Sequence, residues 1–286
     1  MIKLIDNAIS QNDINALINW LQTNPQLTYG NLTKELEQQF TDFIGTKYSV
    51  FVNSGSSALL LMIYTLLESE IIDKQSKIVI PALAWATDIA PLIQFGIEPV
   101  LCDCNLDNLS IDLNQVESLI KKDKKIKAIV LVSILGLVPK IKEIEQLCDK
   151  YKIILIEDVC ESIGSLYNNK KLGNFGLMSV FSTFFVHQIT TIEGGFINTN
   201  DIKLYNLLLM LRSHGWARDT NKPHQYMQKS KWSIDNFNEQ FTFYVPGFNV
   251  RSTEINAFLG LQQMKRVDEI IKKRNINYNL YNKLIN

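Results

Sequence analysis

The sequence has few cysteines, and their spacing matches no known type of metal or disulfide site. Cys102, Cys104, Cys148 and Cys160 form no CxxC pair, which disfavours a disulfide scaffold, a zinc site and an iron–sulfur cluster. We therefore predict no metal site, and we expect all four thiols to be reduced and mostly buried.

The sequence also lacks an excess of charge and a long apolar run. Lys plus Arg and Asp plus Glu both number 29, so the zero net charge disfavours nucleic acid as a partner. The longest apolar stretches, residues 58–67 and 128–138, fall short of the roughly 20 residues of a membrane span. The first six residues include Asp6 and do not resemble a signal peptide, so we expect a cytoplasmic protein without membrane contact.

What the sequence does contain is enough apolar material for a sizeable core. Hydrophobic residues make up 46% of the 286 residues, which allows one large domain or two ordinary ones. Short β-branched runs alternate with helical stretches, which predicts an α/β fold with a mostly parallel sheet covered on both faces. Strands are predicted at residues 77–80, 98–102, 128–133, 153–156 and 196–199, and helices at 114–122, 141–151 and about 201–212.

Two later segments have a different character. Residues 221–238 are polar, and we expect an irregular surface loop or lid there. Residues 252–284 have helical periodicity behind a start signal at Thr253 and Glu254, and are predicted as one long helical segment.

Candidate binding residues follow the predicted strands, where ligands bind in open parallel sheets. Ser54-Gly55-Ser56-Ser57 opens an apolar helix and has the amides and hydroxyls of a phosphate site, although an ordinary serine cap is the alternative. Trp85 could stack on a flat ring or belong to the core. Asp158 needs a hydrogen-bonding or cationic partner, either loop amides or a protonated heterocyclic nitrogen.

His187 is one of three histidines and precedes Glu193-Gly194-Gly195 by six residues. An imidazole can accept and return a proton near neutral pH. A lone histidine is more often structural, so the residue type alone leaves both readings open.

Together these motifs resemble the DegT/DnrJ/EryC1/StrS family of sugar aminotransferases and dehydratases, which use pyridoxal phosphate (PLP) or its amine form (PMP). The resemblance extends from about residue 29 to residue 273. It depends on the ordered segments 53–59, 81–87, 156–161, 181–182, 191–195, 246–249 and 253–255.

The resemblance implies a fold and a set of site residues. It implies an aspartate-aminotransferase-like large domain (PLP fold type I) over residues 1–250, and a long helix at 251–286 that begins an incomplete C-terminal small domain. It also implies a homodimer with shared active sites, because Asn249 matches a position that reaches the neighbouring subunit's phosphate. The implied cofactor contacts are Ser56, Ser57 and Ser182 with the phosphate, Trp85 with the ring face, Asp158 with the ring nitrogen and Glu161 with the ring oxygen.

His187 departs from the aminotransferase pattern, which has a lysine that binds PLP covalently at this position. A subset of the family has the same histidine and removes the C3 hydroxyl of a nucleotide-linked 4-keto-6-deoxy sugar. Residues 184–195 and 212–219 resemble that subset, which implies non-covalent PLP or PMP and GDP-4-keto-6-deoxy-mannose as substrate. His187 would be the catalytic base and L-glutamate the amino donor, with His214, Arg218 and Arg251 near the substrate.

Two alternatives remain open. The chain could be a nucleotide-sugar 4-aminotransferase with an unusual histidine, or an inactive relative that binds a sugar nucleotide. A CDP-sugar dehydratase with an iron–sulfur cluster is disfavoured because no cysteine follows Cys160.

Overall fold

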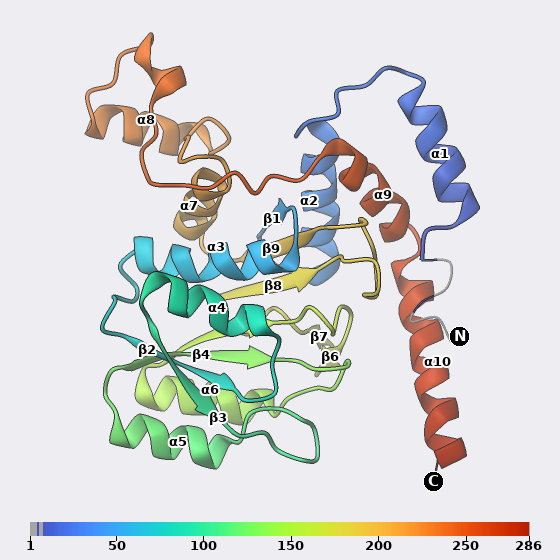
Figure 1. Ribbon diagram of the computed structural model, residues 1–286, viewed down its shortest axis with the longest axis vertical. Helices are drawn as coiled ribbons and strands as arrows, with labels where there is room; N and C mark the ends of the chain where they lie inside the picture. The colour runs from blue at the N-terminus through green and yellow to red at the C-terminus, as the bar shows by residue number, and fades with distance from the viewer. Residues whose placement is uncertain (1–4, 6–7, 286) are drawn as a thin grey trace.

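The computed structural model describes residue 5 and residues 8–285. It has one large sheet with helices on both faces (Figure 1), which confirms the predicted α/β class. The prediction of a cytoplasmic protein used residues 1–6, and of these only Ile5 belongs to the described residues. No helix within the described part combines the length and the apolar character that a membrane span requires.

Six of the strands in the large sheet run in the same direction, and one runs against them. The sheet order is β1-β9-β8-β5-β4-β2-β3, and β9 is antiparallel to both of its neighbours while the other pairs are parallel. The strands are β1 (Tyr48–Val52), β2 (Lys77–Pro81), β3 (Glu98–Cys102), β4 (Ile126–Val132), β5 (Ile154–Asp158), β8 (Met178–Ser182) and β9 (Gly195–Thr199). A separate hairpin consists of β6 (Leu166–Tyr167) and β7 (Lys170–Lys171).

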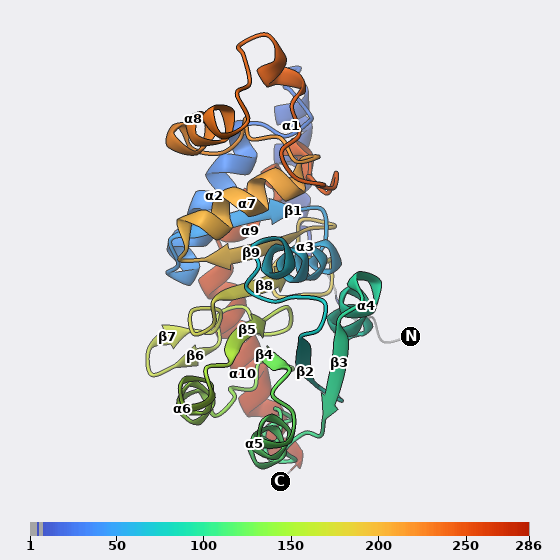
Figure 2. The ribbon, with the colours of Figure 1, turned by 90° about the vertical axis from the view of Figure 1, so that its left-hand side faces the viewer.

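The alternation of side chains along the strands produces two cores, one on each face of the sheet, and helices lie on both sides of the strands (Figure 2). Val50 and Val52 point to one core, while Phe51 between them points to the other. The first core is covered by α3 (Gly55–Glu68), α4 (Ala86–Phe95) and α7 (Ile202–Arg212). The second is covered by α2 (Asn31–Ile44), α5 (Leu113–Lys122), α6 (Ile141–Tyr151) and α9 (Glu254–Met264). Helix α1 (Gln11–Leu21) packs on α9 through a stacked Trp20–Phe258 pair.

The predicted irregular loop at 221–238 contains a helix instead, so that prediction is wrong for much of the segment. Helix α8 (Lys222–Lys231) begins where the Asn221 side chain accepts a hydrogen bond from the His224 N–H, and it buries no residue. Without a buried face there is no apolar periodicity to detect. A 3₁₀ turn, η1 (Asn238–Phe241), follows.

The predicted continuous helical segment at 252–284 is two helices. Helix α9 ends at Met264 and α10 (Val267–Ile285) begins after Lys265 and Arg266. The break lies where Arg266 turns back to bind the carboxylate of Asp13 and the Ala8 carbonyl. This interaction depends on a residue some 250 positions away, which helical periodicity cannot reveal.

All four cysteines are free thiols, but only Cys102 and Cys148 are buried, whereas Cys104 and Cys160 are partly exposed. The expectation that most are buried therefore applies to half of them. Within residue 5 and residues 8–285, no three His, Cys, Asp or Glu side chains cluster as a metal site would require.

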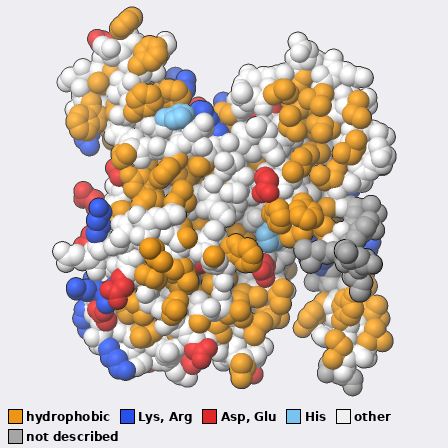
Figure 3. Space-filling model, viewed as in Figure 1, with side chains coloured by type: hydrophobic (Ala, Val, Ile, Leu, Met, Phe, Trp, Pro, Cys, Tyr) orange, Lys and Arg blue, Asp and Glu red, His pale blue; other side chains and the backbone are white. Residues whose placement is uncertain are grey.

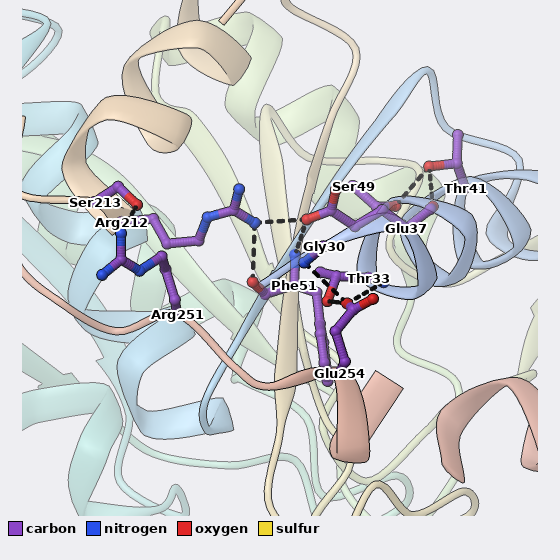
Figure 4. A network of polar contacts seen from close by, with 10 residues as sticks. All are labelled: Gly30, Thr33, Glu37, Thr41, Ser49, Phe51, Arg212, Ser213, Arg251 and Glu254. Atoms are coloured by element: carbon purple, nitrogen blue, oxygen red, sulfur yellow. Dashed lines mark hydrogen bonds and ion pairs between the residues drawn. The ribbon is translucent and has the colours of Figure 1, made fainter. Parts of the chain in front are cut away.

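A buried ion pair supports the outer edge of the sheet at β1 (Figure 4). The Arg212 side chain is fully buried, and its Nη1 lies 2.6 Å from Oε1 of Glu37 and donates to the Phe51 carbonyl at 3.1 Å. Glu37 in turn accepts the Phe51 N–H at 2.8 Å. Both backbone groups of an edge-strand residue are thereby satisfied.

Glu254 performs a similar role at the start of α2 (Figure 4). Its carboxylate accepts hydrogen bonds from the N–H groups of Gly30, Leu32 and Thr33 and from the Thr33 hydroxyl. The first amides of a helix carry partial positive charge and have no partner within the helix. This contact fixes α9 against α2.

Removing one member of the Arg212–Glu37 pair should destabilise the protein strongly. We expect Arg212→Leu to lower the free energy of unfolding by about 3–5 kcal/mol, because the Glu37 carboxylate would remain buried without its partner. The double variant Glu37→Leu/Arg212→Leu should recover part of that loss. Urea titration measures the stability of both variants, and a double variant no more stable than Arg212→Leu would contradict this expectation.

Candidate active site

The predicted site residues converge at the carboxyl ends of the parallel strands. In the sheet register Gly195 pairs with Val52 on one side and with Ser182 on the other. Asp158 ends β5, which lies next to β8, and Pro81 ends β2. Because these strands point the same way, the segments that follow them share one edge of the sheet.

The serine motif forms the N-terminus of α3. Ser54 is the cap, and its side chain accepts the Ser57 N–H and donates to the Ser57 hydroxyl, both at 3.0 Å. Ser56 is exposed and Ser57 partly so. Ser54 is therefore an ordinary serine cap. The next amides of the first turn and the Ser56 hydroxyl are free to bind an anion.

Two glycines allow Ser182 and the serine motif to approach each other. A Cβ on Gly55 would lie 2.7 Å from the Cβ of Ser182, and a Cβ on Gly195 would lie 2.6 Å from the carbonyl of Ser54. Neither position can hold a larger residue without moving the backbone. The start of α3 and the end of β8 therefore form one cradle of hydroxyl and amide groups.

Trp85 and Asp158 differ in their exposure. The Trp85 side chain is 73% exposed at the cap position of α4, so it does not belong to the core. Asp158 is 4% exposed, and its Oδ1 accepts the Cys160 N–H at 2.8 Å. Burial raises the pKa of Asp158 above its ordinary value, while the hydrogen bonds from Cys160 oppose that shift.

His187 lies in the loop between β8 and β9, next to the same edge. Its backbone N–H donates to the Phe184 carbonyl at 3.0 Å, and its carbonyl accepts from Arg274 of α10. The half-buried imidazole has a pKa below its ordinary value because burial outweighs the opposing influence of Glu161 and Asp158. At neutral pH the ring is therefore mainly neutral and able to accept a proton.

Glu161 is held by the loop that follows β4. Its Oε2 accepts the Leu135 N–H at 2.9 Å, and its backbone carbonyl accepts from the Gln188 side chain. These bonds connect the segments after β4, β5 and β8. They also hold the residue that follows His187.

A cavity of about 990 Å³ separates the His187 loop from α10. It is lined by His187 and Gln188, by Leu135 and Gly136 of the loop after β4, and by residues of α10 such as Arg274. The volume is within the range of small-molecule sites. The imidazole is thus next to a space that a ligand of moderate size can enter.

The three predicted substrate residues, His214, Arg218 and Arg251, lie close to one another on the segments that follow α7 and precede α9. Arg251 donates to the Ser213 hydroxyl at 3.2 Å and lies 3.5 Å from the His214 ring nitrogen. The Arg218 guanidinium lies 3.4 Å above the Trp216 ring. Burial and the charge of Arg218 lower the pKa of Arg251, so the arginines are near one another and suited to an anion.

Asn249 is exposed and belongs to a segment that crosses the end of β1. Asn249 forms an isolated antiparallel β-bridge with Ser213, and the Val250 carbonyl accepts the Asn53 N–H at 2.9 Å. The segment therefore lies beside the serine motif. The predicted contact of Asn249 with a second subunit stays a prediction.

Sequence reasoning missed two features of the site. One is Asp88, a buried carboxyl in α4 whose only signal was an acidic residue within an otherwise apolar helix. The other is the Glu37–Arg212 pair, which joins residues 175 positions apart. The sequence carried no signal for that pairing.

Comparison with known proteins identifies similar chains along nearly the whole sequence. The model of the DegT/DnrJ/EryC1/StrS aminotransferase family matches residues 7–286. The GDP-4-keto-6-deoxy-D-mannose 3-dehydratase of Yersinia pseudotuberculosis is 36% identical over 98% of this chain and 71% of its own length. The enzyme of the same name from Escherichia coli O55:H7 is 39% identical over 87% of this chain and 64% of its own length.

Solved structures give the same result. The Escherichia coli GDP-4-keto-6-deoxy-D-mannose-3-dehydratase with bound hydrated PLP superposes with a TM-score of 0.88 and 36% identity, covering 96% of this chain and 70% of that one. A GDP-4-keto-6-deoxymannose-3-dehydratase with a trapped PLP-glutamate geminal diamine gives 0.82 and 36%, covering 92% and 67%.

The protonation of His187 can be measured directly. We expect its ring to titrate below 6.5 in an NMR pH series, with Glu161→Gln lowering the pKa further because a nearby negative charge is removed. Glu193→Gln, an exposed carboxylate in the same loop, is the matched control and should leave the His187 pKa unchanged. A pKa above 6.5 for His187 in the wild type would show that the nearby carboxylates outweigh the effect of burial.

Proposed function

Because the chain belongs to the DegT/DnrJ/EryC1/StrS aminotransferase family, we propose that it is a PMP-dependent 3-dehydratase of a nucleotide-linked 4-keto-6-deoxy sugar. The substrate we propose is GDP-4-keto-6-deoxy-mannose, on which two similar enzymes act by name. The observation that carries this proposal is His187, a neutral, half-buried imidazole where aminotransferases of the family have a lysine.

The residues at the sheet edge suit a pyridoxal cofactor. The hydroxyls of Ser56, Ser57 and Ser182 and the first amides of α3 match the needs of a phosphate. Trp85 offers an exposed indole for the ring face. Asp158 is a buried carboxyl that would gain a cationic partner from the ring nitrogen, and Glu161 would lie near the ring oxygen.

When bound, such a cofactor supplies an amine and a ring that withdraws electrons. The residues of this chain would bind and orient the cofactor and the sugar, and one of them would move a proton. Asp158 would keep the ring nitrogen protonated, because a carboxylate favours a cation beside it. A ring nitrogen of His187 would accept a proton from the amine-bearing carbon of the bound cofactor and could return it to the departing C3 hydroxyl.

The proposed overall reaction balances without an external reductant. The sugar loses its C3 oxygen, and L-glutamate gains one oxygen as it is converted to 2-oxoglutarate and ammonia. A trapped PLP-glutamate adduct in a similar enzyme supports glutamate as the donor. Arg218, Arg251 and His214 offer positive charge and donors for the carboxylate or diphosphate of the reactants.

We further propose a homodimer in which Asn249 reaches the phosphate site of the second subunit. In support, Asn249 is exposed and lies on the segment beside the serine motif. The lobe around α8 also exposes large hydrophobic side chains, visible at the upper left of Figure 3. These side chains are Tyr226, Met227, Trp232, Phe237, Phe241 and Phe243.

The decisive test is a histidine variant. With PMP and the 4-keto sugar supplied, we expect His187→Asn to slow loss of the C3 hydroxyl by about 10²–10⁴-fold, the usual worth of a general base. Binding of PMP should persist, because none of the proposed phosphate or ring contacts involves this side chain. His224→Asn, on the exposed helix α8, is the matched control and should retain full activity.

Mass spectrometry of the products from GDP-, CDP- and UDP-linked 4-keto sugars provides the readout. A product that keeps its C3 hydroxyl and gains an amine at C4 would indicate an aminotransferase and overturn the proposal. So would a visible absorbance of bound PLP that borohydride removes by fixing the cofactor to the chain. No turnover of any sugar in the presence of bound PMP would favour an inactive binding protein.

A further inference from the structure

Asp88 is a buried acid at the site that makes none of the proposed contacts with cofactor or substrate. Asp88, the third residue of α4, is 1% exposed. Its Oδ2 accepts the Trp85 N–H at 3.1 Å, whereas no donor among the described residues reaches its buried Oδ1. A buried carboxyl oxygen without a partner is costly, so the surroundings of Oδ1 need an explanation.

The group that faces Asp88 is the carboxyl of Asp158, within hydrogen-bond reach. Two ionised carboxylates offer only acceptors to each other and repel. A single shared proton converts this contact into a hydrogen bond between a carboxylic acid and a carboxylate. The unpartnered Oδ1 of Asp88 is the natural place for such a proton.

The two partners differ in how well they support a negative charge. Asp158 receives the Cys160 N–H at 2.8 Å and a further bond from the Cys160 thiol, while Asp88 receives only the Trp85 N–H. Burial and the charge of Asp158 raise the pKa of Asp88 to about 9. The proton therefore belongs to Asp88, and the charge belongs to Asp158.

We infer that Asp88 is a positioning residue, a neutral carboxylic acid that donates a hydrogen bond to Asp158 and holds that carboxylate anionic and oriented toward the site. The pair then carries one negative charge, which matches one cationic ring nitrogen. The identification of that cation as the ring nitrogen of the cofactor rests on the proposed function. The proton shared by Asp88 and Asp158 is inferred independently of that function.

Other titratable groups lie close to this pair. Cys160 donates hydrogen bonds to Asp158 and feels the charge of Asp88, and Glu161 and His187 interact electrostatically with Asp158. A variant of Asp88 has to be compared with the wild type over the same pH range, so that the titration of these neighbours cancels in the difference.

The shared proton makes the stability of the ligand-free protein depend on pH in a defined direction. Below about 3.9, the ordinary pKa of an aspartate, Asp88 is protonated in both the folded and the unfolded state. Between there and about 9, only the folded state holds the proton, so stability falls as pH rises. The unfolding equilibrium constant should change by up to about tenfold per pH unit relative to a variant without this proton.

Two variants test the inference. Asp88→Asn keeps a donor of similar shape without a titrating proton, and Asp88→Leu removes the donor. Because Glu37 and Glu157 are also buried carboxyls, the infrared spectrum of Asp88→Asn is subtracted from that of the ligand-free wild type at pH 7, and we expect the C=O stretch of a buried carboxylic acid in the difference. The wild type should also lose stability relative to Asp88→Asn as pH rises from 5 to 9.

PLP affinity adds a third measurement. Asp88→Asn should bind PLP nearly as well as the wild type, and Asp88→Leu about tenfold more weakly or worse, the worth of a hydrogen bond to a charged group. The absence of an acid band from the difference between wild type and Asp88→Asn, the same dependence of stability on pH in these two proteins, or an equal loss of PLP affinity in both variants would overturn the inference. A wild type that binds no PLP would instead refute the proposed function, while the infrared and pH measurements would still decide whether Asp88 holds the proton.

Discussion

The placement of buried negative charge is the constraint on which the site depends. Asp158 ends β5 at 4% exposure, and the groups around its carboxyl are Cys160, Asp88 and Glu161. Burying a carboxylate is costly unless donors or a cation compensate it. A cationic ligand at this edge of the sheet therefore gains a partner that the protein has already desolvated.

The other groups at this edge are complementary to such a ligand. The start of α3 and the end of β8 meet closely because Gly55 and Gly195 have no side chain, and they form a cradle for an anion beside the carboxyl of β5. The buried pair of Glu37 and Arg212 fixes the edge strand that leads into this cradle. Anion and cation sites thus occupy neighbouring strand ends on a rigid support.

Much of the fold, and the convergence of several candidate site residues at one edge of the sheet, could be predicted from the sequence because they depend on local signals. Strands buried on both faces read as continuous apolar runs, and residues that follow them converge at one edge. Helix α8 gave no such signal because it buries no side chain. The break before α10 and the pairing of Arg212 with Glu37 depend on contacts between distant residues. Asp88 was not singled out because an acidic residue in the first turn of a helix is usually explained by the helix dipole.

The protonation state of the ring nitrogen in bound PLP shows whether the buried Asp158 carboxylate pairs with the cofactor. With PLP labelled isotopically at that nitrogen, NMR of the complex distinguishes a protonated ring from a neutral one. We expect the nitrogen to stay protonated well above the pH at which free PLP loses that proton, and we expect this difference to disappear in Asp158→Asn. A neutral ring nitrogen at pH 7 in the wild type would contradict the role given to the buried carboxylate.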